Sequence, residues 1–269
     1  MADGADRDAT GRPDRAGEPA PLVEPVPDAP AAVADLGGET GLLVADYHAG
    51  IEVGLRYERG VELDGAGDER RERLCDLLAD TGADRLVVLG DLGHRIGGAG
   101  DAEREEVAAL LSAVGVPVTL APGNHDPGLA EAFDDRLDVM PPGGARLGDV
   151  GVLHGHTWPA PAVLGADVVC MGHEHPAVRL EDAVGGGRAE PAWLRGPLAR
   201  EAFGDAVDLS DVAWRDPELI AFPAFNDRSG GTWVNVAGQG FLAPFLPDGF
   251  AGGEAYLLDG TRLGDYRRV

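Results

Sequence analysis

The sequence predicts an α/β protein whose second half is richer in strands than its first, as in a sandwich of two sheets with helices outside. Between residues 41 and 121, buried-strand patterns alternate with segments that carry leucines at helical spacing. This order implies parallel strand pairing with right-handed crossovers. Beyond residue 126 strand patterns dominate. A chain of 269 residues can bury the core of one such domain.

The elements of the first half follow from turns and apolar periodicity. The turn at Gly37-Gly38 predicts a hairpin of two strands, residues 31–36 and 41–45. Residues 49–67 are rich in glycine and charge, and we expect a loop there. The periodicity then predicts, in order, a helix at 68–81, a strand at 85–89, a helix at 101–114, a strand at 116–121 and a short helix at 127–133.

In the second half, short apolar runs separated by turn residues predict a series of strands. We expect irregular loops at 196–217 and 239–253. Residues 1–20 contain almost no large apolar side chain and are predicted to be a disordered, acidic and Pro-rich tail, which leaves 21–269 as a single domain. The predicted strands are 150–153, 167–171, 177–180, 192–194 and 219–222, followed by a hairpin of 254–258 and 262–267.

The charge is unusual, because the net charge is −25 and all 22 basic residues are arginines. An acidic surface of this kind is typical of proteins that stay soluble in concentrated salt, and a halophilic archaeon is the expected source. An acidic tail on an ordinary domain is the alternative, but acidic residues continue through the whole chain. In dilute salt such a charge repels nucleic acid. At about 1 M salt the screening length is only about 3 Å, so the arginines at a site matter more.

The charge predicts that the fold weakens in dilute buffer. At about 0.01 M salt the Debye length is near 30 Å, and carboxylates across the surface then repel one another. We expect the melting temperature to fall steadily as salt is lowered from molar to millimolar, measured by circular dichroism. A melting temperature that is flat over this range would contradict salt adaptation.

Nothing in the sequence indicates export or a membrane. No apolar run is long enough to span a bilayer, and the N-terminus lacks a basic segment followed by an apolar one. The two cysteines, Cys75 and Cys170, lie far apart in apolar contexts and match no metal-ligand spacing. We therefore expect a cytoplasmic protein with two buried thiols and no membrane partner. The oligomeric state is left open by the sequence.

Polar side chains follow the ends of the predicted strands. In open α/β sheets this edge is where ligands bind. Seven nitrogen and oxygen ligands are too many for one tetrahedral zinc and suit two metals that share a carboxylate. Imidazole, carboxylate and amide donors fit Mn, Fe, Zn or Co better than Ca. We expect two divalent ions, with Mn²⁺ first and Fe, Zn, Co or Mg as alternatives. The candidate ligands are Asp46, His48, Asp91, Asn124, His154, His173 and His175.

Each of these pieces is weak alone, because any single histidine is more often a core or loop residue. Together they resemble the five sequence blocks of the calcineurin-like metallophosphoesterases, in the family's order. The resemblance implies a metal-dependent phosphoesterase with a four-layer α/β/β/α sandwich. It also implies that the ligands divide into Asp46, His48 and His175 for one metal and Asn124, His154 and His173 for the other, with Asp91 as the bridge.

A narrower resemblance is to the prokaryotic phosphoesterases associated with DNA ligases or helicases. Residues 193–196 (Trp-Leu-Arg-Gly), residues 223–231 and the context of residues 46–52 carry it. One departure is Tyr47-His48-Ala49, because that branch more often has leucine on either side of the histidine. This branch implies a link to DNA repair and to repair partner proteins.

The chemistry implied is attack on phosphorus by a hydroxide that bridges the two metals. Arg56 and Arg59 could neutralise charge on the phosphoryl oxygens. The leaving alkoxide needs a proton, and His125, which follows a ligand in the sequence, is the natural general acid. Asp126 could orient His125 as part of the catalytic pair, or it could cap the helix that begins at Pro127, which we favour.

Three further polar residues have open roles. His94 either reaches the site or stays in its loop, and His156 is expected to lie behind the ligands. Asn226 could line the substrate pocket, although an asparagine in a glycine-rich loop is usually a turn residue.

The leading function is hydrolysis of phosphodiester bonds in nucleic acid or in nucleotide products of repair, with phosphomonoesters also open. The alternative is a phosphatase or phosphodiesterase for a small metabolite. A metal-holding interaction module without catalysis is disfavoured by the complete ligand set together with His125.

Overall fold

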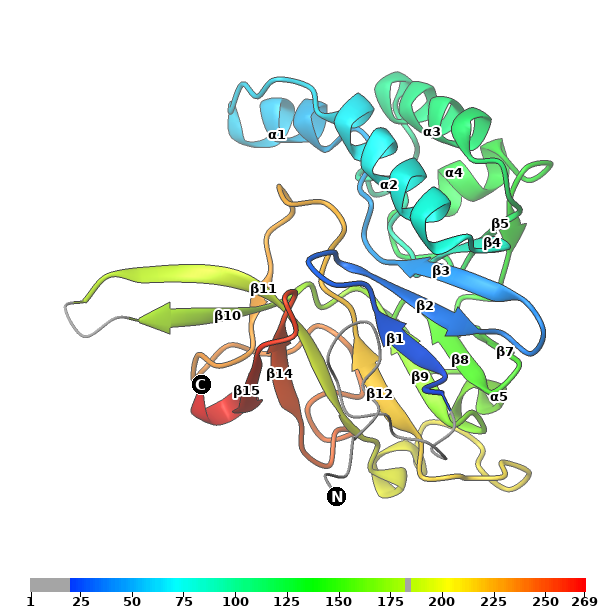
Figure 1. The fold of residues 1–269 in the computed structure, drawn as a ribbon, viewed down its shortest axis with the longest axis vertical. Coiled ribbons are helices and arrows are strands. Elements are labelled where there is room, and N and C mark those ends of the chain that lie inside the picture. Colours follow the sequence, from blue (N-terminus) through cyan, green and yellow to red (C-terminus); the bar gives the residue numbers. More distant parts are fainter. Residues whose placement is uncertain (1–19, 182–184) are drawn as a thin grey trace, which may run out of the picture.

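The computed structural model describes residues 20–181 and 185–269, so the predicted tail lies outside the described residues except for Ala20. Two sheets pack face to face (Figure 1). The first has six strands, of which β1 to β3 pair antiparallel and β3 to β6 pair parallel. Its strands, in spatial order, are β1 (Val23–Pro25), β2 (Ala31–Asp35), β3 (Thr40–Val44), β4 (Arg85–Val88), β5 (Val118–Leu120) and β6 (Asp138–Val139).

The second sheet has nine strands in the order β13-β10-β11-β12-β9-β8-β7, with β14 paired to β11 and β15. The strands β8, β9 and β12 are parallel neighbours, and β10 and β11 form a long hairpin that projects from the body (Figure 1). The strands are β7 (Ala145–Leu147), β8 (Val150–Leu153), β9 (Val168–Met171), β10 (Pro176–Glu181), β11 (Gly187–Pro197), β12 (Glu218–Ala221), β13 (Thr232–Trp233), β14 (Glu254–Leu257) and β15 (Arg262–Asp265).

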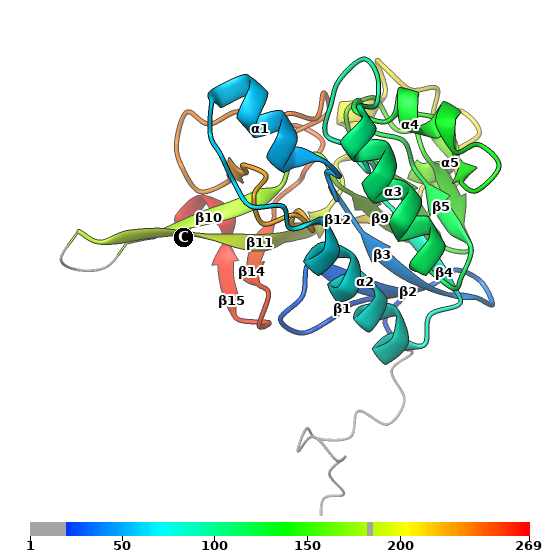
Figure 2. The same cartoon turned by 90° about the horizontal axis from the view of Figure 1, so that it is seen from above.

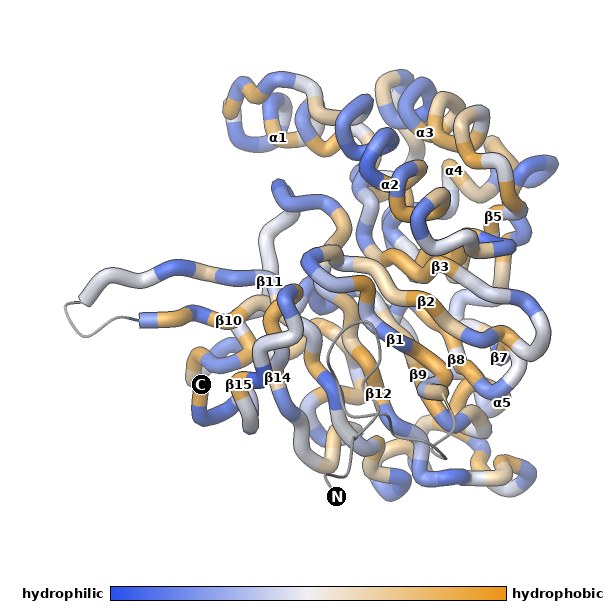
Figure 3. Tube along the Cα trace, viewed as in Figure 1, coloured by the Kyte–Doolittle hydropathy of each residue, from blue (hydrophilic) through white to orange (hydrophobic). Residues whose placement is uncertain are grey.

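The central strands are buried on both faces, which explains why their sequences are apolar throughout. On β3, Leu42 and Val44 pack outward under the helices, whereas Leu43 packs between the sheets. On β12, Ile220 faces the first sheet and Leu219 faces away from it. Successive side chains of a strand thus point to opposite sides of the sheet, and here both sides are buried. Figure 3 shows the resulting concentration of apolar residues on the strands of the sandwich.

Helices cover the outer face of the first sheet, as Figure 2 shows for α2 and α3. The outer face of the second sheet is covered mainly by loops, together with α5 and a 3₁₀ turn at Arg200–Phe203. The four layers are therefore present, but the last of them is thin. The helices are α1 (Ile51–Arg59), α2 (Gly67–Thr81), α3 (Asp101–Ala113), α4 (Pro127–Ala132) and α5 (Pro161–Leu164). Among the described residues, none of them combines the length and apolar character needed to cross a lipid bilayer.

The expectation of a loop over residues 49–67 is wrong for its first part, because residues 51–59 form α1. Glycines in the left-handed conformation, Gly50 and Gly60, flank this helix. The helix has only nine residues, and Gly54 stands in its middle, which favours a loop in a sequence-based prediction. A side chain at Gly54 would collide with the ring of His94, so packing against the site selects a residue of low helix propensity here.

A buried ionic network ties α1, α2 and α3 together beside Gly50. The Arg70 guanidinium donates to Glu52 on α1 at 2.9 Å and to Glu106 on α3 at 2.7 Å. Glu106 in turn accepts the Gly50 N–H at 2.8 Å, two residues after His48. Arg228, from the segment after β12, reaches the same Glu52 carboxylate at 2.9 Å. The network therefore fixes the position of the segment that connects β3 to α1.

Replacing Arg70 by alanine should lower the free energy of unfolding by about 3 kcal/mol, the low end of the range for a broken buried pair, because Glu52 then keeps only Arg228 and Glu106 keeps only the Gly50 N–H. Urea unfolding at fixed molar salt measures the loss. The matched control is Arg71→Ala, whose partner Asp68 is 84% exposed, so water already screens that pair. Equal stability of the two variants would show that the network does not hold these helices together.

Candidate metal centre

The predicted ligands lie just beyond the ends of parallel strands from both sheets. Asp46 and His48 follow β3, Asp91 follows β4, and Asn124 follows β5. In the second sheet, His154 follows β8, whereas His173 and His175 follow β9. Because the two sheets stack face to face, these strand ends meet at one edge of the sandwich.

Six of the seven candidates form two compact groups of donor atoms. Asp46, His48 and His175 make up the first group, with their atoms within 4.8 Å of one another, and Asp91, His154 and His173 make up the second. The carboxylates lie close to the imidazoles, with 3.2 Å from His175 Nε2 to Asp46 Oδ1 and 3.4 Å from His154 Nε2 to Asp91 Oδ1. The convergence expected from the sequence is therefore present in the structure.

Asn124 lies in the turn beside these groups. The next residue, His125, donates its backbone N–H to Asp91 Oδ1 at 3.1 Å. The side-chain oxygen of Asn124 is buried and accepts no hydrogen bond. A buried amide oxygen without a donor is costly, so it calls for a cation or another donor in the site.

The backbone at the ligands is strained. Asp46, His48, Asp91, His173 and His175 all have positive φ, between 42° and 70°. Non-glycine residues rarely adopt this left-handed conformation, and each instance costs free energy unless the surrounding structure imposes it. The sharp bends let a strand end direct closely spaced side chains to the same place.

Two glycines make room for the ligands. Gly90 has φ 77°, and a Cβ there would collide with the ring of His154. A Cβ on Gly123 would collide with the Asp91 carboxylate. The lack of space for a Cβ therefore explains why a glycine stands before the polar residue in Gly90-Asp91 and in Gly123-Asn124.

The hydrogen-bond network assigns the tautomers of three histidines. His48 Nδ1 donates to the Gly93 carbonyl at 3.2 Å, His154 Nδ1 to Leu89 at 2.9 Å and His175 Nδ1 to Gly230 at 2.7 Å. Each of these rings therefore presents the lone pair of Nε2 to the site. This arrangement is typical of metal-binding histidines, whose other nitrogen donates to a carbonyl.

These lone pairs face one another at short range. His48 Nε2 lies 3.4 Å from His175 Nε2, and His154 Nε2 lies 3.1 Å from His173 Nδ1. With Nδ1 of each ring bound to a carbonyl, His48 and His175 bring their Nε2 atoms together, where two unprotonated rings repel each other, and carboxylate oxygens add further negative charge. A divalent cation in each group removes this repulsion, so the residues present fit two metal ions. Imidazole, carboxylate and amide donors suit Mn, Fe, Zn or Co.

The carboxylates dominate the electrostatics. Burial alone would lower the pKa of His175, but Asp46 beside it raises that pKa to about 9. Burial would also lower the pKa of His154, but the neighbouring Asp91 outweighs burial and raises that pKa to about 9. Burial lowers the pKa of His48 to about 4, which keeps its lone pair available. The site therefore has a negative potential that attracts cations.

His125 lies at the opening of this centre, with its side chain 19% exposed. Its Nδ1 donates to the carbonyl of His94, and its Nε2 lies 3.6 Å from Asp91 Oδ2. The same Nε2 could also join His48 and Asp91 as a third group of metal-binding donors. The backbone of the 93–100 loop, rather than a carboxylate, therefore orients this imidazole.

The two roles expected for Asp126 are both corrected by the structure. Asp126 occupies the position before α4, but its side chain makes no capping hydrogen bond and none to His125. Its buried carboxylate accepts the N–H of Gly93 at 3.2 Å and of Gly123 at 2.7 Å. It thus joins the two loops that carry Asp91 and His125. Burial and the nearby Asp91 raise its pKa to about 6.

Of the other expected site residues, two lie beside the donor groups and two do not contact them. Asn226 is buried and donates to the carbonyl of Tyr47 at 3.0 Å, so it braces the Asp46–His48 segment. The ring of His156 lies 5.4 Å from that of His154, beside the second group but outside it. Arg56 pairs with Glu62 at 2.7 Å, and neither it nor Arg59 contacts a predicted ligand.

Two buried glutamates were missed from the sequence. Glu174, between two predicted ligands, accepts the N–H of Leu242 at 2.9 Å and of Ala243 at 2.7 Å. Glu103 accepts the N–H of His94 at 2.8 Å and of Gly100 at 2.5 Å and so shapes the 93–100 loop. A glutamate three residues into a helix is a capping signal that could have indicated Glu103.

The sandwich and its paired donor groups define a metal-dependent hydrolase of phosphate esters. The chain belongs to the calcineurin-like phosphoesterase family, whose model matches residues 33–177. No curated protein sequence matches the chain.

Two solved structures resemble the chain, and the first of them shares its fold. The nuclease MPE from Pseudomonas putida is 20% identical, with a TM-score of 0.55 over 90% of this chain and all of that one. The phosphoesterase Yfce from E. coli is 18% identical, with a TM-score of 0.38 over 84% of this chain and 97% of that one.

Proposed function

We propose that this protein hydrolyses phosphodiester bonds in nucleic acids or nucleotides, with two divalent ions in the paired donor groups. One ion is assigned to Asp46, His48 and His175, and the other to Asn124, His154 and His173. Asp91 is assigned to both, because its carboxylate lies within 4.8 Å of a ring nitrogen of His48, in the first group, and of His154, in the second. The closeness of one carboxylate to donor atoms of both groups is the observation that carries the proposal.

When bound, the metals would clamp the phosphate oxygens and lower the pKa of a water molecule. The protein's own residues then have three tasks. The carbonyls of Gly93, Leu89 and Gly230 hold the ligand imidazoles in place. The carboxylate of Asp126 fixes the loops on either side of the site. His125, oriented by the His94 carbonyl, protonates the leaving oxygen.

Mn²⁺ is the proposed metal, because imidazole nitrogens and carboxylate oxygens occur together in the donor set. Nucleic acid is the proposed substrate class. The sequence likeness of residues 193–196 and 223–231 to phosphoesterases associated with DNA ligases and helicases favours a repair substrate. The fold shared with a nuclease is a further reason to test nucleic acid first.

The test is an assay of the pure protein in molar salt with added Mn²⁺. The substrates are bis-p-nitrophenyl phosphate, p-nitrophenyl phosphate, and single- and double-stranded DNA, and metal content is measured by mass spectrometry. We expect two metal equivalents per chain and faster turnover of the diester and DNA. Turnover of the monoester alone would favour a small-metabolite phosphatase, and no turnover with both metals bound would refute hydrolysis.

A further inference from the structure

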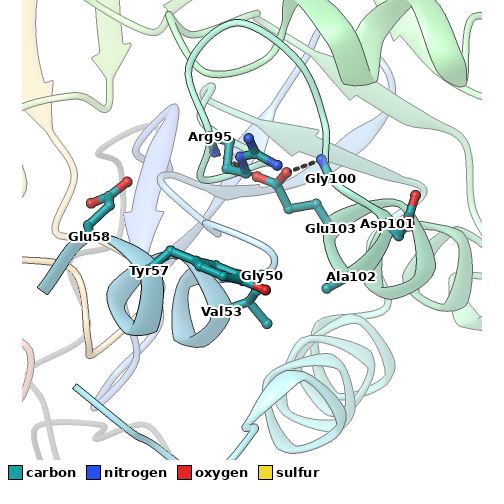
Figure 4. A pocket seen from close by; sticks show the side chains of 10 residues that line it. Gly50, Val53, Tyr57, Glu58, Arg95, Gly100, Asp101, Ala102 and Glu103 are labelled. Atoms are coloured by element: carbon teal, nitrogen blue, oxygen red, sulfur yellow. Dashed lines mark hydrogen bonds between the residues drawn. The ribbon is translucent and has the colours of Figure 1, made fainter. Parts of the chain in front are cut away.

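A pocket of about 510 Å³ opens between α1 and the start of α3. This volume is in the range of small-molecule sites in proteins. Figure 4 shows the Tyr57 ring reaching from α1 toward the start of α3, with Val53 near its end and Arg95 across the opening. Gly50, Gly54 and Gly100 also line the pocket and leave it without side chains there.

The pocket adjoins the metal centre. Gly50 follows His48 by two residues, and Gly54 packs against the ring of His94. That ring lies 5.4 Å from the ring of His48 and 6.0 Å from the ring of His125. His94 therefore stands between the pocket and the ligands. The pocket and the donor groups are therefore separated by a single imidazole ring.

The lining includes groups that have no side-chain partner among the described residues. Tyr57 is 85% exposed and stacks on no other ring in the described part of the chain. Arg95 is exposed, and its guanidinium makes no ion pair with any described residue. Glu58 and Asp101 offer carboxylate acceptors at the same pocket. A flat ring, a free cation and nearby acceptors are the groups that bind a nucleobase by stacking and hydrogen bonding.

We propose that this pocket binds a nucleobase of a single-stranded nucleic acid, next to the phosphate that is hydrolysed. The inference rests on the proposed function and specifies its substrate. The base stacks on Tyr57, and Arg95 lies over the outer edge of the base. The net charge of −25 supports stacking as the source of affinity. A protein this acidic attracts polyanions poorly, and molar salt screens the phosphate contacts that remain.

A second pocket beside the centre is less suited to a base. It has a volume of about 290 Å³ and is lined by His175 and Trp233, among others. The Trp233 ring is 37% exposed and is already covered by the Arg179 guanidinium at 5.9 Å. No guanidinium of the described arginines lies over the Tyr57 ring. Trp233 therefore provides the matched control for Tyr57.

The test measures binding of a fluorescent phosphorothioate oligothymidylate, which resists hydrolysis, to the Mn²⁺-loaded protein in molar salt. An abasic oligomer of the same length reports the backbone alone. Tyr57→Ala should weaken oligothymidylate binding by about 5- to 150-fold, the range for loss of one aromatic stack. Tyr57→Phe and Trp233→Ala should retain binding, and the abasic oligomer should not distinguish the variants.

Three results would overturn the base pocket: no loss with Tyr57→Ala, an equal loss on the abasic oligomer, or a loss with Trp233→Ala instead. Turnover of methyl p-nitrophenyl phosphate, which has no base, reports the proposed function separately. If this ester is hydrolysed but Tyr57→Ala binds normally, only the base pocket fails. If Tyr57 governs binding but no phosphodiester is hydrolysed, the base pocket stands and the proposed activity fails.

Discussion

Replacing Asp91 by alanine is expected to remove metal from both donor groups and to abolish phosphoesterase activity. Asp91 is 3% exposed, and its two oxygens face His154 on one side and His125 on the other. A carboxylate shared by two ions contributes to both, so its loss cannot be confined to one. We expect turnover to fall by more than about 10³-fold, since the loss of a single charge-stabilising donor already costs about 10²–10³-fold.

Metal content per chain, measured by mass spectrometry after gel filtration, is the direct readout. The matched control is Asp149→Ala, because Asp149 is 43% exposed and pairs with Arg146 on the surface. The control should keep both metals and full activity. The melting temperature of Asp91→Ala should equal that of wild-type protein treated with chelator, which separates metal loss from misfolding. Two metals per chain in Asp91→Ala would rule out the bridge.

The parts of the fold that the sequence predicted share one property. The strands β4 and β9, for example, are apolar runs that stop at a glycine before a polar residue. Burial on both faces produces the apolar run, and the collisions at Gly90 and Gly123 explain the glycines. Both causes leave a pattern of neighbouring residues in the sequence, so the positions of the metal-binding candidates could be predicted from it.

The parts that were missed depend on contacts between distant segments. The helix α1 is fixed by the Arg70 network and by the fit of Gly54 against His94, neither of which leaves a periodic pattern. The position of Asp126 before Pro127 suggested a cap, yet its carboxylate is used by Gly93, thirty-three residues earlier. Pairings of this kind become visible only when the chain is folded.

The same limit applies to the histidines. Motif order predicted the paired groups of donors, but it could not reveal that the His94 carbonyl orients His125. That hydrogen bond depends on the shape of the 93–100 loop, which the buried carboxylate of Glu103 holds through backbone N–H groups. The role of His125 as an acid therefore has to be tested against the alternative that its ring is a metal ligand.

Replacing His125 by alanine is expected to leave the fold and both metals in place and to slow turnover by roughly 10²–10⁴-fold, the usual range for a positioned acid or base. The ring is 19% exposed at the opening of the centre, and the His94 carbonyl fixes its Nδ1. Its Nε2 is thereby directed toward Asp91, where a substrate's leaving oxygen can reach it. Metal content and steady-state kinetics, measured on the same preparation, give the two readouts.

The leaving group decides what His125 does. A p-nitrophenolate leaves without protonation, whereas an alkoxide needs a proton, so the defect of His125→Ala should be small on a p-nitrophenyl ester and largest on an alkyl ester. His156→Ala is the matched control, since its ring lies beside His154 but outside both groups of donors. Loss of metal from His125→Ala would instead make His125 a ligand alongside His48 and Asp91. An equal defect on both esters with metal retained would make it a residue that positions the substrate.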